Sequence, residues 1–212
     1  SVAGSNFDNL ALTDINNPKP GTSNYEVPHR FTLRASYGHE FFGDYTTRFS
    51  LFGYTKEGQP QSYSMSGSDL EGDGFFGRHL LYVPEGPADP NIVFAEGFDT
   101  AAFMDWVAKE GLKSGMSERN GQHAKWSTRF DLRIDQELPF FGSSRTRLYA
   151  KIYNLGNLLN DSWGHVNDAE FFTQQVVNSS VNEEGQYVYE NFNGGSINQL
   201  LENRSLWTVR IG

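Results

Sequence analysis

The sequence predicts an all-β protein, and more narrowly a segment of an antiparallel transmembrane β-barrel. Residues 30–37 alternate strictly, with apolar side chains at odd positions and polar ones at even positions. Residues 126–135 alternate in the same way, and their polar face is rich in Arg and Asp. Because successive side chains of a strand point to opposite sides, each strand has one apolar and one charged face. This pattern is typical of a strand with lipid on one side and a wet lumen on the other.

The composition is compatible with such a barrel and excludes several other classes. The 212 residues contain no Cys, so a disulfide scaffold and a thiolate metal site are excluded. The sequence has no run of about 18 apolar residues for a membrane-spanning helix, whereas spanning strands need only about 9–11 alternating residues. A net charge of −9 argues against nucleic acid as a partner, since phosphate contacts need clustered Lys and Arg.

The first elements follow from turn residues and alternation. Residues 1–27 are rich in Asn, Gly, Pro and Asp and are expected to form a loop. A strand is expected over 28–40, a tight turn at 41–44, and a second strand from 45 to about 56, with a continuation to 65 left open. The turn contains Phe-Phe-Gly-Asp, in which Gly permits the sharp reversal.

A long acidic stretch, 66–124, follows and is expected to be a loop. Within it, Asp99 can cap a short helix that Gly111 can end. One face of this helix would carry Phe103, Trp106 and Val107. The helix is therefore expected to be a small packing element inside the loop.

The second half of the chain repeats the strand–turn–strand design. A strand is expected over 125–138, a turn at 139–144 with a second Phe-Phe-Gly, and a return strand over 145–155. Three further strands are expected near 163–177, near 186–192 and from 205 to the last residue.

The connections alternate between tight turns and long loops, which is the layout of outer-membrane barrels with the short turns on the periplasmic side. Seven strands do not close such a barrel, which usually has an even number of about 8 or more. An open sheet of this kind would expose to water an apolar face and two edge strands with unpaired backbone groups. The sequence therefore predicts a part of a larger protein, with both ends of the chain cut.

Five motifs occur in a set order: 27–31 (Val-Pro-His-Arg-Phe), 67–74, 80–84, 129–134 and 152–164 (Ile-Tyr-Asn-Leu-Gly-Asn-Leu-Leu-Asn-Asp-Ser-Trp-Gly). In this order and spacing they resemble the C-terminal portion of TonB-dependent outer-membrane receptors, in the Oar-like branch that has a carboxypeptidase-regulatory-like domain. The resemblance covers roughly residues 24–212.

The resemblance implies a barrel of about 22 strands, of which this chain would hold about the last seven. Residues 1–27 would be an extracellular loop segment and 28–212 the C-terminal part of the barrel, with 66–124 as a long extracellular loop. The plug domain and the segment that contacts TonB would lie outside this chain. The implied activity is energised uptake or export of a bulky ligand, driven through TonB and its inner-membrane motor, in the outer membrane of a Gram-negative bacterium.

A carboxylate-rich turn is the one candidate metal site. Asp69, Glu71 and Asp73 occur at every second position, with Gly72 and Gly74 for the turn. Oxygen ligands at this spacing suit Ca²⁺, but the twelfth position of the loop lacks the bidentate Glu of an EF-hand. Calcium binding and a solvated acidic turn both remain open, and no other cofactor is expected.

The polar faces of the strands form a row of charges that is expected to face the lumen, since Arg at lipid mid-depth costs about 2–4 kcal/mol. The row consists of Arg30, Arg34, Arg48, Arg129, Asp131, Arg133, Asp135, Arg147, Lys151 and Arg210. It would dock the plug or guide solute, or its members would only form cross-strand ion pairs.

Four aromatic residues near strand ends, Tyr37, Tyr45, Trp126 and Trp207, are expected to form a girdle at the membrane interface or to pack in the ordinary way. No nucleophile elbow, phosphate loop or dinucleotide motif occurs, and an enzyme is not expected. Two alternatives remain open. One is a secreted β-sandwich that binds glycans or proteins, and the other is a passive porin without a plug.

Overall fold

The structure, a computed structural model, describes residues 10–14, 16–67, 69, 70, 72, 74, 76–142, 144–168, 173–195 and 199–212. Strands dominate it, so the protein is all-β, as the sequence predicts. The chain divides into two compact units. Residues 1–26, 59–124 and 169–197 form one, called the loop unit, and residues 27–58, 125–168 and 198–212 form the other, called the sheet unit.

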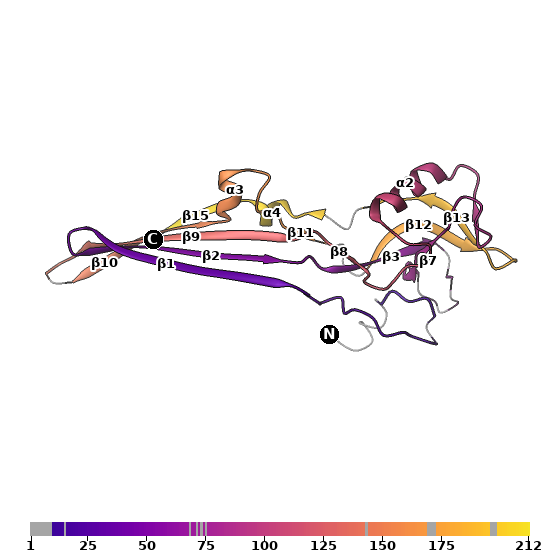
Figure 1. Ribbon diagram of the computed structural model, residues 1–212, viewed down its shortest axis with the longest axis horizontal. Coiled ribbons are helices and arrows are strands. Elements are labelled where there is room, and N and C mark those ends of the chain that lie inside the picture. Colours follow the sequence, from indigo (N-terminus) through magenta and orange to yellow (C-terminus); the bar gives the residue numbers. More distant parts are fainter. Residues whose placement is uncertain are drawn as a thin grey trace. The chain divides into compact units, whose positions relative to one another are not determined.

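The sheet unit is built on long antiparallel strands (Figure 1). Their order in the sheet is β1-β2-β9-β10-β15. The bounds are β1 Arg30–Phe42, β2 Tyr45–Lys56, β9 Ser127–Pro139, β10 Arg145–Tyr153 and β15 Thr208–Ile211. The first four agree with the predicted strands to within a few residues. Alternation therefore sufficed to locate them.

Both predicted tight turns are confirmed. Gly43 has a φ of 61° between β1 and β2, and Gly142 has a φ of 67° between β9 and β10. These values lie in the left-handed region, which glycine enters without steric cost. In the second turn the Phe140 amide donates to the Ser144 carbonyl oxygen over 3.1 Å. Both Phe-Phe-Gly segments therefore belong to hairpins, but Phe42 still pairs with Tyr45 in the first, whereas the second hairpin closes at the Pro139–Arg145 pair.

After β10 the chain reverses direction, and hydrogen bonds from two Asn side chains of the 152–164 motif hold this reversal in place. Asn154 has a φ of 56°, and its side-chain nitrogen donates to the carbonyl oxygens of Gly164 (3.0 Å) and Ser205 (2.6 Å). Asn157 donates in the same way to the carbonyl oxygens of Asp161 (2.9 Å) and Trp163 (3.1 Å). The short elements of this region are α3 Leu155–Leu159, β11 Asn167–Asp168, β14 Gln199–Leu200 and α4 Glu202–Ser205.

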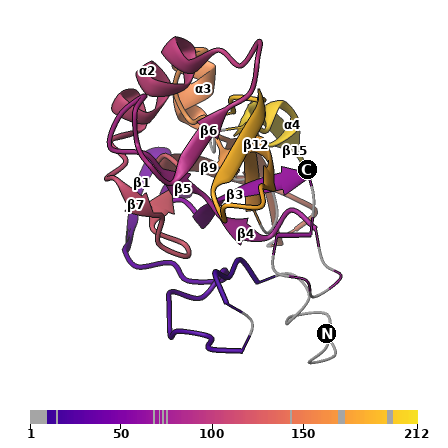
Figure 2. The same ribbon diagram turned by 90° about the vertical axis from the view of Figure 1, so that its right-hand side faces the viewer.

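The loop unit has a sheet of its own, with the order β4-β3-β12-β13-β6 (Figure 2). Its strands are β3 Pro60–Gly67, β4 His79–Leu80, β6 Ile92–Phe94, β12 Thr173–Val181 and β13 Tyr187–Phe192. β12 runs parallel to β3, and β13 runs parallel to β6. Three shorter strands complete the unit: β5 Tyr82–Val83 pairs with β7 Gly115–Met116, and β8 Gln122–His123 pairs with β3.

The predicted helix is confirmed as α2, Thr100–Glu110. The Asp99 carboxylate accepts a hydrogen bond from the Ala102 amide over 2.9 Å, and Gly111 ends the helix with a φ of 66°. The helix buries Phe103 and Val107, and Trp106 packs against the same core. That core consists of Tyr63, Met65, Leu81, Val83, Ile92, Phe103, Val107, Val176, Val177 and Tyr189.

The expectation of one antiparallel series of seven strands needs correction. In the described chain the long sheet holds five strands, because the stretches 163–177 and 186–192 contribute β12 and β13 to the sheet of the loop unit. Residues 163–166 form no strand. The stretch 66–124, expected to be a loop, belongs to a packed unit with a hydrophobic core. The strand expected near 186–192 is confirmed as β13, and the one expected near 163–177 overlaps β12 only at its end. Alternation does not reveal their partners, since two of the pairings are parallel and join segments far apart in sequence.

Candidate functional site

Burial in the sheet unit is inverted relative to a water-soluble domain. In the described residues of this unit, every buried residue other than glycine is polar: Thr47, Ser127, Asp135, Asn154, Asn157 and Ser205. Its large apolar side chains are half-buried or exposed instead, with Phe31 at 62% and Leu33 at 52%. Soluble proteins rarely expose a contiguous apolar patch of this kind without a function for it. The sheet is therefore the candidate functional surface.

The strand registers gather the apolar side chains on one face of the sheet. Ala35 lies opposite Leu51, Leu51 opposite Leu132, and Leu132 opposite Ile152. Along each strand the same face repeats at every second residue. Its exposed members include Phe31, Leu33, Tyr37, Leu138, Leu148, Val209 and Ile211. The result is one apolar face that crosses all the strands of this sheet.

The other face is charged. In the strand registers, charged residues lie opposite one another on neighbouring strands, such as Arg48 opposite Asp135 and Lys151 opposite Arg210. All ten charged residues singled out from the sequence share this face: Arg30, Arg34, Arg48, Arg129, Asp131, Arg133, Asp135, Arg147, Lys151 and Arg210. The same registers add residues that sequence reasoning did not single out, namely Lys56, Glu137 and Arg145, together with Ser36 and Ser50. The alternation that revealed the others also marks these positions.

Ion pairs on this face are of two kinds. Arg129 and Arg133 each pair with the carboxylate two residues further along β9, Asp131 at 3.2 Å and Asp135 at 2.6 Å. Glu137 bridges to β10, where it pairs with Arg145 (3.2 Å) and Arg147 (2.9 Å). The cross-strand pairing considered in the sequence analysis therefore occurs at Glu137, and the other two pairs run along one strand.

Cations outnumber carboxylates on this face. One row across the sheet reads Ser36, Ser50, Arg133, Lys151 and Arg210, each opposite the next. Within the described part of the chain, no carboxylate lies within 4.0 Å of the Lys151 or Arg210 cation. Both lie instead near the Tyr153 ring, at 4.1 Å and 5.6 Å from its centroid. Three adjacent cations thus stand in a single row.

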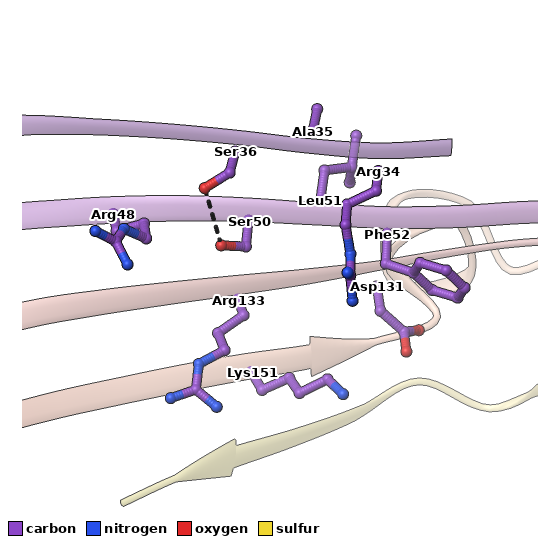
Figure 3. A pocket seen from close by; sticks show the side chains of 10 residues that line it. All are labelled: Arg34, Ala35, Ser36, Arg48, Ser50, Leu51, Phe52, Asp131, Arg133 and Lys151. Carbon is purple, nitrogen blue, oxygen red and sulfur yellow. Dashed lines mark hydrogen bonds between the residues drawn. The ribbon is translucent and has the colours of Figure 1, made fainter. Parts of the chain in front are cut away.

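A hollow of about 540 Å³ opens over the centre of the charged face. Figure 3 shows the side chains around it: Arg34, Ala35, Ser36, Arg48, Ser50, Leu51, Phe52, Asp131, Arg133 and Lys151. The hydroxyl oxygens of Ser36 and Ser50 lie 3.4 Å apart. Four cationic groups and two hydroxyls around one carboxylate make this hollow strongly positive. Such a surface attracts oxyanions.

The four predicted interface aromatics do not behave alike. Trp126 is 45% exposed and stacks between His29 and Phe31, at centroid distances of 6.3 Å and 6.4 Å. Tyr37 is exposed on the apolar face, where its ring stacks on that of His39 at a centroid distance of 6.3 Å, and Trp207 is also exposed. The Arg145 guanidinium, in contrast, lies over the Tyr45 ring, 5.4 Å from its centroid. Tyr45 therefore contacts a cation, whereas Trp126 and Tyr37 stack on neighbouring rings.

The candidate calcium turn falls largely outside the described residues, since Glu71 and Asp73 lie there. The Asp69 carboxylate accepts a hydrogen bond from the Gly74 amide over 2.8 Å, as in a simple carboxylate-capped turn. Elsewhere in the described chain, no three His, Asp or Glu side chains come together in a way that could hold a metal ion. Calcium at this turn stays a prediction.

No protein-family model, curated protein or solved structure matches this chain. In the described residues, no helix has both the length and the apolar character needed to cross a membrane.

Proposed function

We propose that this chain is part of an outer-membrane TonB-dependent receptor, with the sheet unit as barrel wall and the loop unit as part of its ligand-selecting extracellular region. The single observation that carries the proposal is the inverted burial of the sheet unit. None of its described large apolar side chains is buried, and its buried residues other than glycine are polar. Lipid against one face and water against the other would satisfy both sets of side chains.

The strand lengths support this proposal. β1 and β9 have 13 residues each and β2 has 12, whereas a tilted strand needs about 9–11 to cross a bilayer. In the part of the chain that is described, β1 pairs only with β2 and β15 only with β10. Exposed edges of this kind promote aggregation unless further strands cover them. The proposal therefore requires neighbouring strands from the rest of a closed barrel.

The connections support the assignment of sides. The hairpins β1–β2 and β9–β10 turn within a few residues, whereas the connection from β2 to β9 runs through residues 59–124 of the loop unit. The connection from β10 to β15 runs through residues 169–197 of the same unit. Outer-membrane barrels have short periplasmic turns and long extracellular loops. The loop unit would thus lie outside the cell, where a ligand is first met.

The energised step comes from the sequence resemblance alone. Force transmitted by TonB would act on a plug domain outside this chain, and the sheet unit would be the passive wall around it. No observation favours a catalytic role. The β-sandwich alternative needs a second sheet against the apolar face, and it predicts a protein that is soluble without detergent.

The proposal is tested on the native gene product in its own cells. Membranes are separated by density, and the outer-membrane fraction is analysed for a band whose migration changes on heating, as folded barrels show. We expect the protein in that fraction and expect it to cross-link to TonB in intact cells. Recovery in the soluble fraction without detergent would overturn the barrel assignment, and an outer-membrane protein that never cross-links to TonB would support a passive porin.

A further inference from the structure

The row Arg133, Lys151 and Arg210 puts three cations directly opposite one another on β9, β10 and β15. Like charges in opposite positions of a sheet are destabilising. Arg133 is compensated by Asp135, whose carboxylate lies 2.6 Å away. Lys151 and Arg210 find only the Tyr153 ring in the described chain. Within the described residues, Lys151 and Arg210 therefore place positive charge without a paired carboxylate on the charged face of β10 and β15.

The neighbouring rows add to this charge. Arg34 and Arg48 line the hollow beside Ser36 and Ser50 (Figure 3). Within the residues that the structure describes, neither arginine forms an ion pair. The sign is opposite to that of the whole chain, which has a net charge of −9. The positive charge is thus concentrated on one face, although the protein as a whole is acidic.

We propose that this hollow is a binding site for an oxyanion, a solute that carries phosphate or carboxylate groups. Guanidinium groups present a planar fork of donors that matches these groups, and the two serine hydroxyls add further donors. The volume of about 540 Å³ falls in the range of small-molecule pockets, about 300–1,000 Å³. The inference rests on the proposed function in one respect, because the charged face must be open to water.

A single cysteine in the hollow reports both the access of water and the local charge. Ser50→Cys is suitable, because Ser50 is opposite Arg133 and the 212 residues contain no Cys. Any Cys elsewhere in the full-length protein is first replaced by Ser. In the full-length protein in outer membranes, two methanethiosulfonate reagents are compared, one with a sulfonate group and one with a trimethylammonium group. A positive hollow accelerates the anionic reagent and slows the cationic one. We expect their rate ratio to exceed that of free cysteine by about tenfold or more.

The double substitution Lys151→Gln/Arg210→Gln in this background removes the uncompensated charges and should lower the ratio by about tenfold. The matched control is Lys56→Gln, which removes one charge from the same face at the far end of β2. Six residues along a strand correspond to about 20 Å, well beyond a Debye length of about 8 Å. The control should therefore leave the ratio within about twofold. If the double variant does not assemble, Lys151→Gln alone gives the same test with a smaller decrease.

Protection identifies the ligand class. Tripolyphosphate and citrate should slow the labelling of Ser50→Cys more than sodium chloride of equal ionic strength, and the double variant should lose this protection. An unaltered ratio in the double variant, or equal slowing by all three salts, would overturn the inference. The proposed function would be unaffected by either result.

A second reporter, Leu33→Cys on the apolar face, separates the two proposals. If Leu33→Cys faces lipid but neither reagent reaches Ser50→Cys, another part of the protein covers the charged face. The anion site is then wrong, and the barrel wall stands. If the protein is soluble without detergent and Leu33→Cys faces water, the proposed function itself fails.

Discussion

The two units of this chain bury opposite kinds of side chain. In the loop unit Phe103, Met65 and Leu81 are fully buried, as in any soluble domain. In the sheet unit Asp135 is 7% exposed, whereas Phe31 is 62% exposed. Both units obey the same rule, that apolar surface leaves water and polar groups find partners. The proposed function would explain this difference by the surroundings, with water around the loop unit and lipid against one face of the sheet unit.

The largest loss of stability is expected from a substitution in the hydrophobic core of the loop unit, and it would show whether the two units fold independently. Phe103 is fully buried and packs against the rings of Tyr189 and Phe192, at centroid distances of 5.6 Å and 5.5 Å. Phe103→Ala should destabilise the loop unit by about 3–5 kcal/mol through lost burial and a cavity. Limited proteolysis of the full-length protein in membranes should cut this variant between residues 59 and 124. The heat-dependent migration of the barrel should stay unchanged, and its loss would show that the two units fold as one.

A charge on the apolar face of the sheet is the next test. Leu51→Arg should cost about 2–4 kcal/mol, because it places a guanidinium in lipid. The control is Thr32→Arg, on the charged face and opposite the uncharged Tyr54, where the new side chain would enter water. Unfolding by guanidinium in lipid vesicles measures both. Equal effects of the two substitutions would contradict the assignment of faces.

A carboxylate in the loop unit provides a third test. Asp89 is buried, and hydrogen bonds from the backbone amides of Asn91 and Glu85, each 2.9 Å long, lower the pKa of its carboxyl group. A lowered pKa in the folded state stabilises the unit fully above the ordinary value of about 4, and this stabilisation is lost as the pH falls through the folded-state pKa.

Asp89→Asn should therefore destabilise the loop unit by about 1.5–3 kcal/mol at neutral pH and should flatten its acid dependence. Proteolysis of the loop unit as a function of pH measures both effects. The sheet unit should not respond. If the variant and the parent lost stability in parallel on acidification, another group would be responsible.

The smallest expected effect is that of the helix cap. Asp99→Ala removes the hydrogen bond to the Ala102 amide and should cost about 1 kcal/mol. Asp99→Asn retains an accepting oxygen and should cost less. Hydrogen exchange of the first-turn amides of α2 distinguishes them. An equal increase in exchange for both substitutions would indicate that charge, and not the cap geometry, holds the helix.

The sequence allowed the sheet unit to be predicted better than the loop unit. Alternation from Arg30 to Tyr37 fixes a strand and its faces, because the side-chain period of a strand is two. The same logic placed Arg133 and Lys151 on one face before their register was known. Asp99 and Gly111 sufficed for the helix, since both ends have local signals.

The rest depends on contacts between distant residues. β12 pairs in parallel with β3 across more than a hundred residues, and the alternation of β3 from Ser62 to Ser66 does not identify that partner. Parallel strands are not joined by a tight hairpin turn, so no local turn signal in the sequence indicates that they pair. The cation row also depends on register, because alternation alone does not say that Lys151 is opposite Arg210. The strand near 186–192 was therefore predicted, whereas its place in a second sheet and the shared core of residues 59–124 and 169–197 were not.

The central claim is that one face of the sheet contacts lipid and the other contacts water. Single cysteines at residues 31 to 37 of β1, in the full-length protein in membranes, can be spin-labelled and exposed to oxygen and to a water-soluble nickel chelate. The account predicts alternation, with odd positions such as Leu33 accessible to oxygen and even positions such as Ser36 accessible to the chelate. Equal access of the chelate to both sets would contradict it.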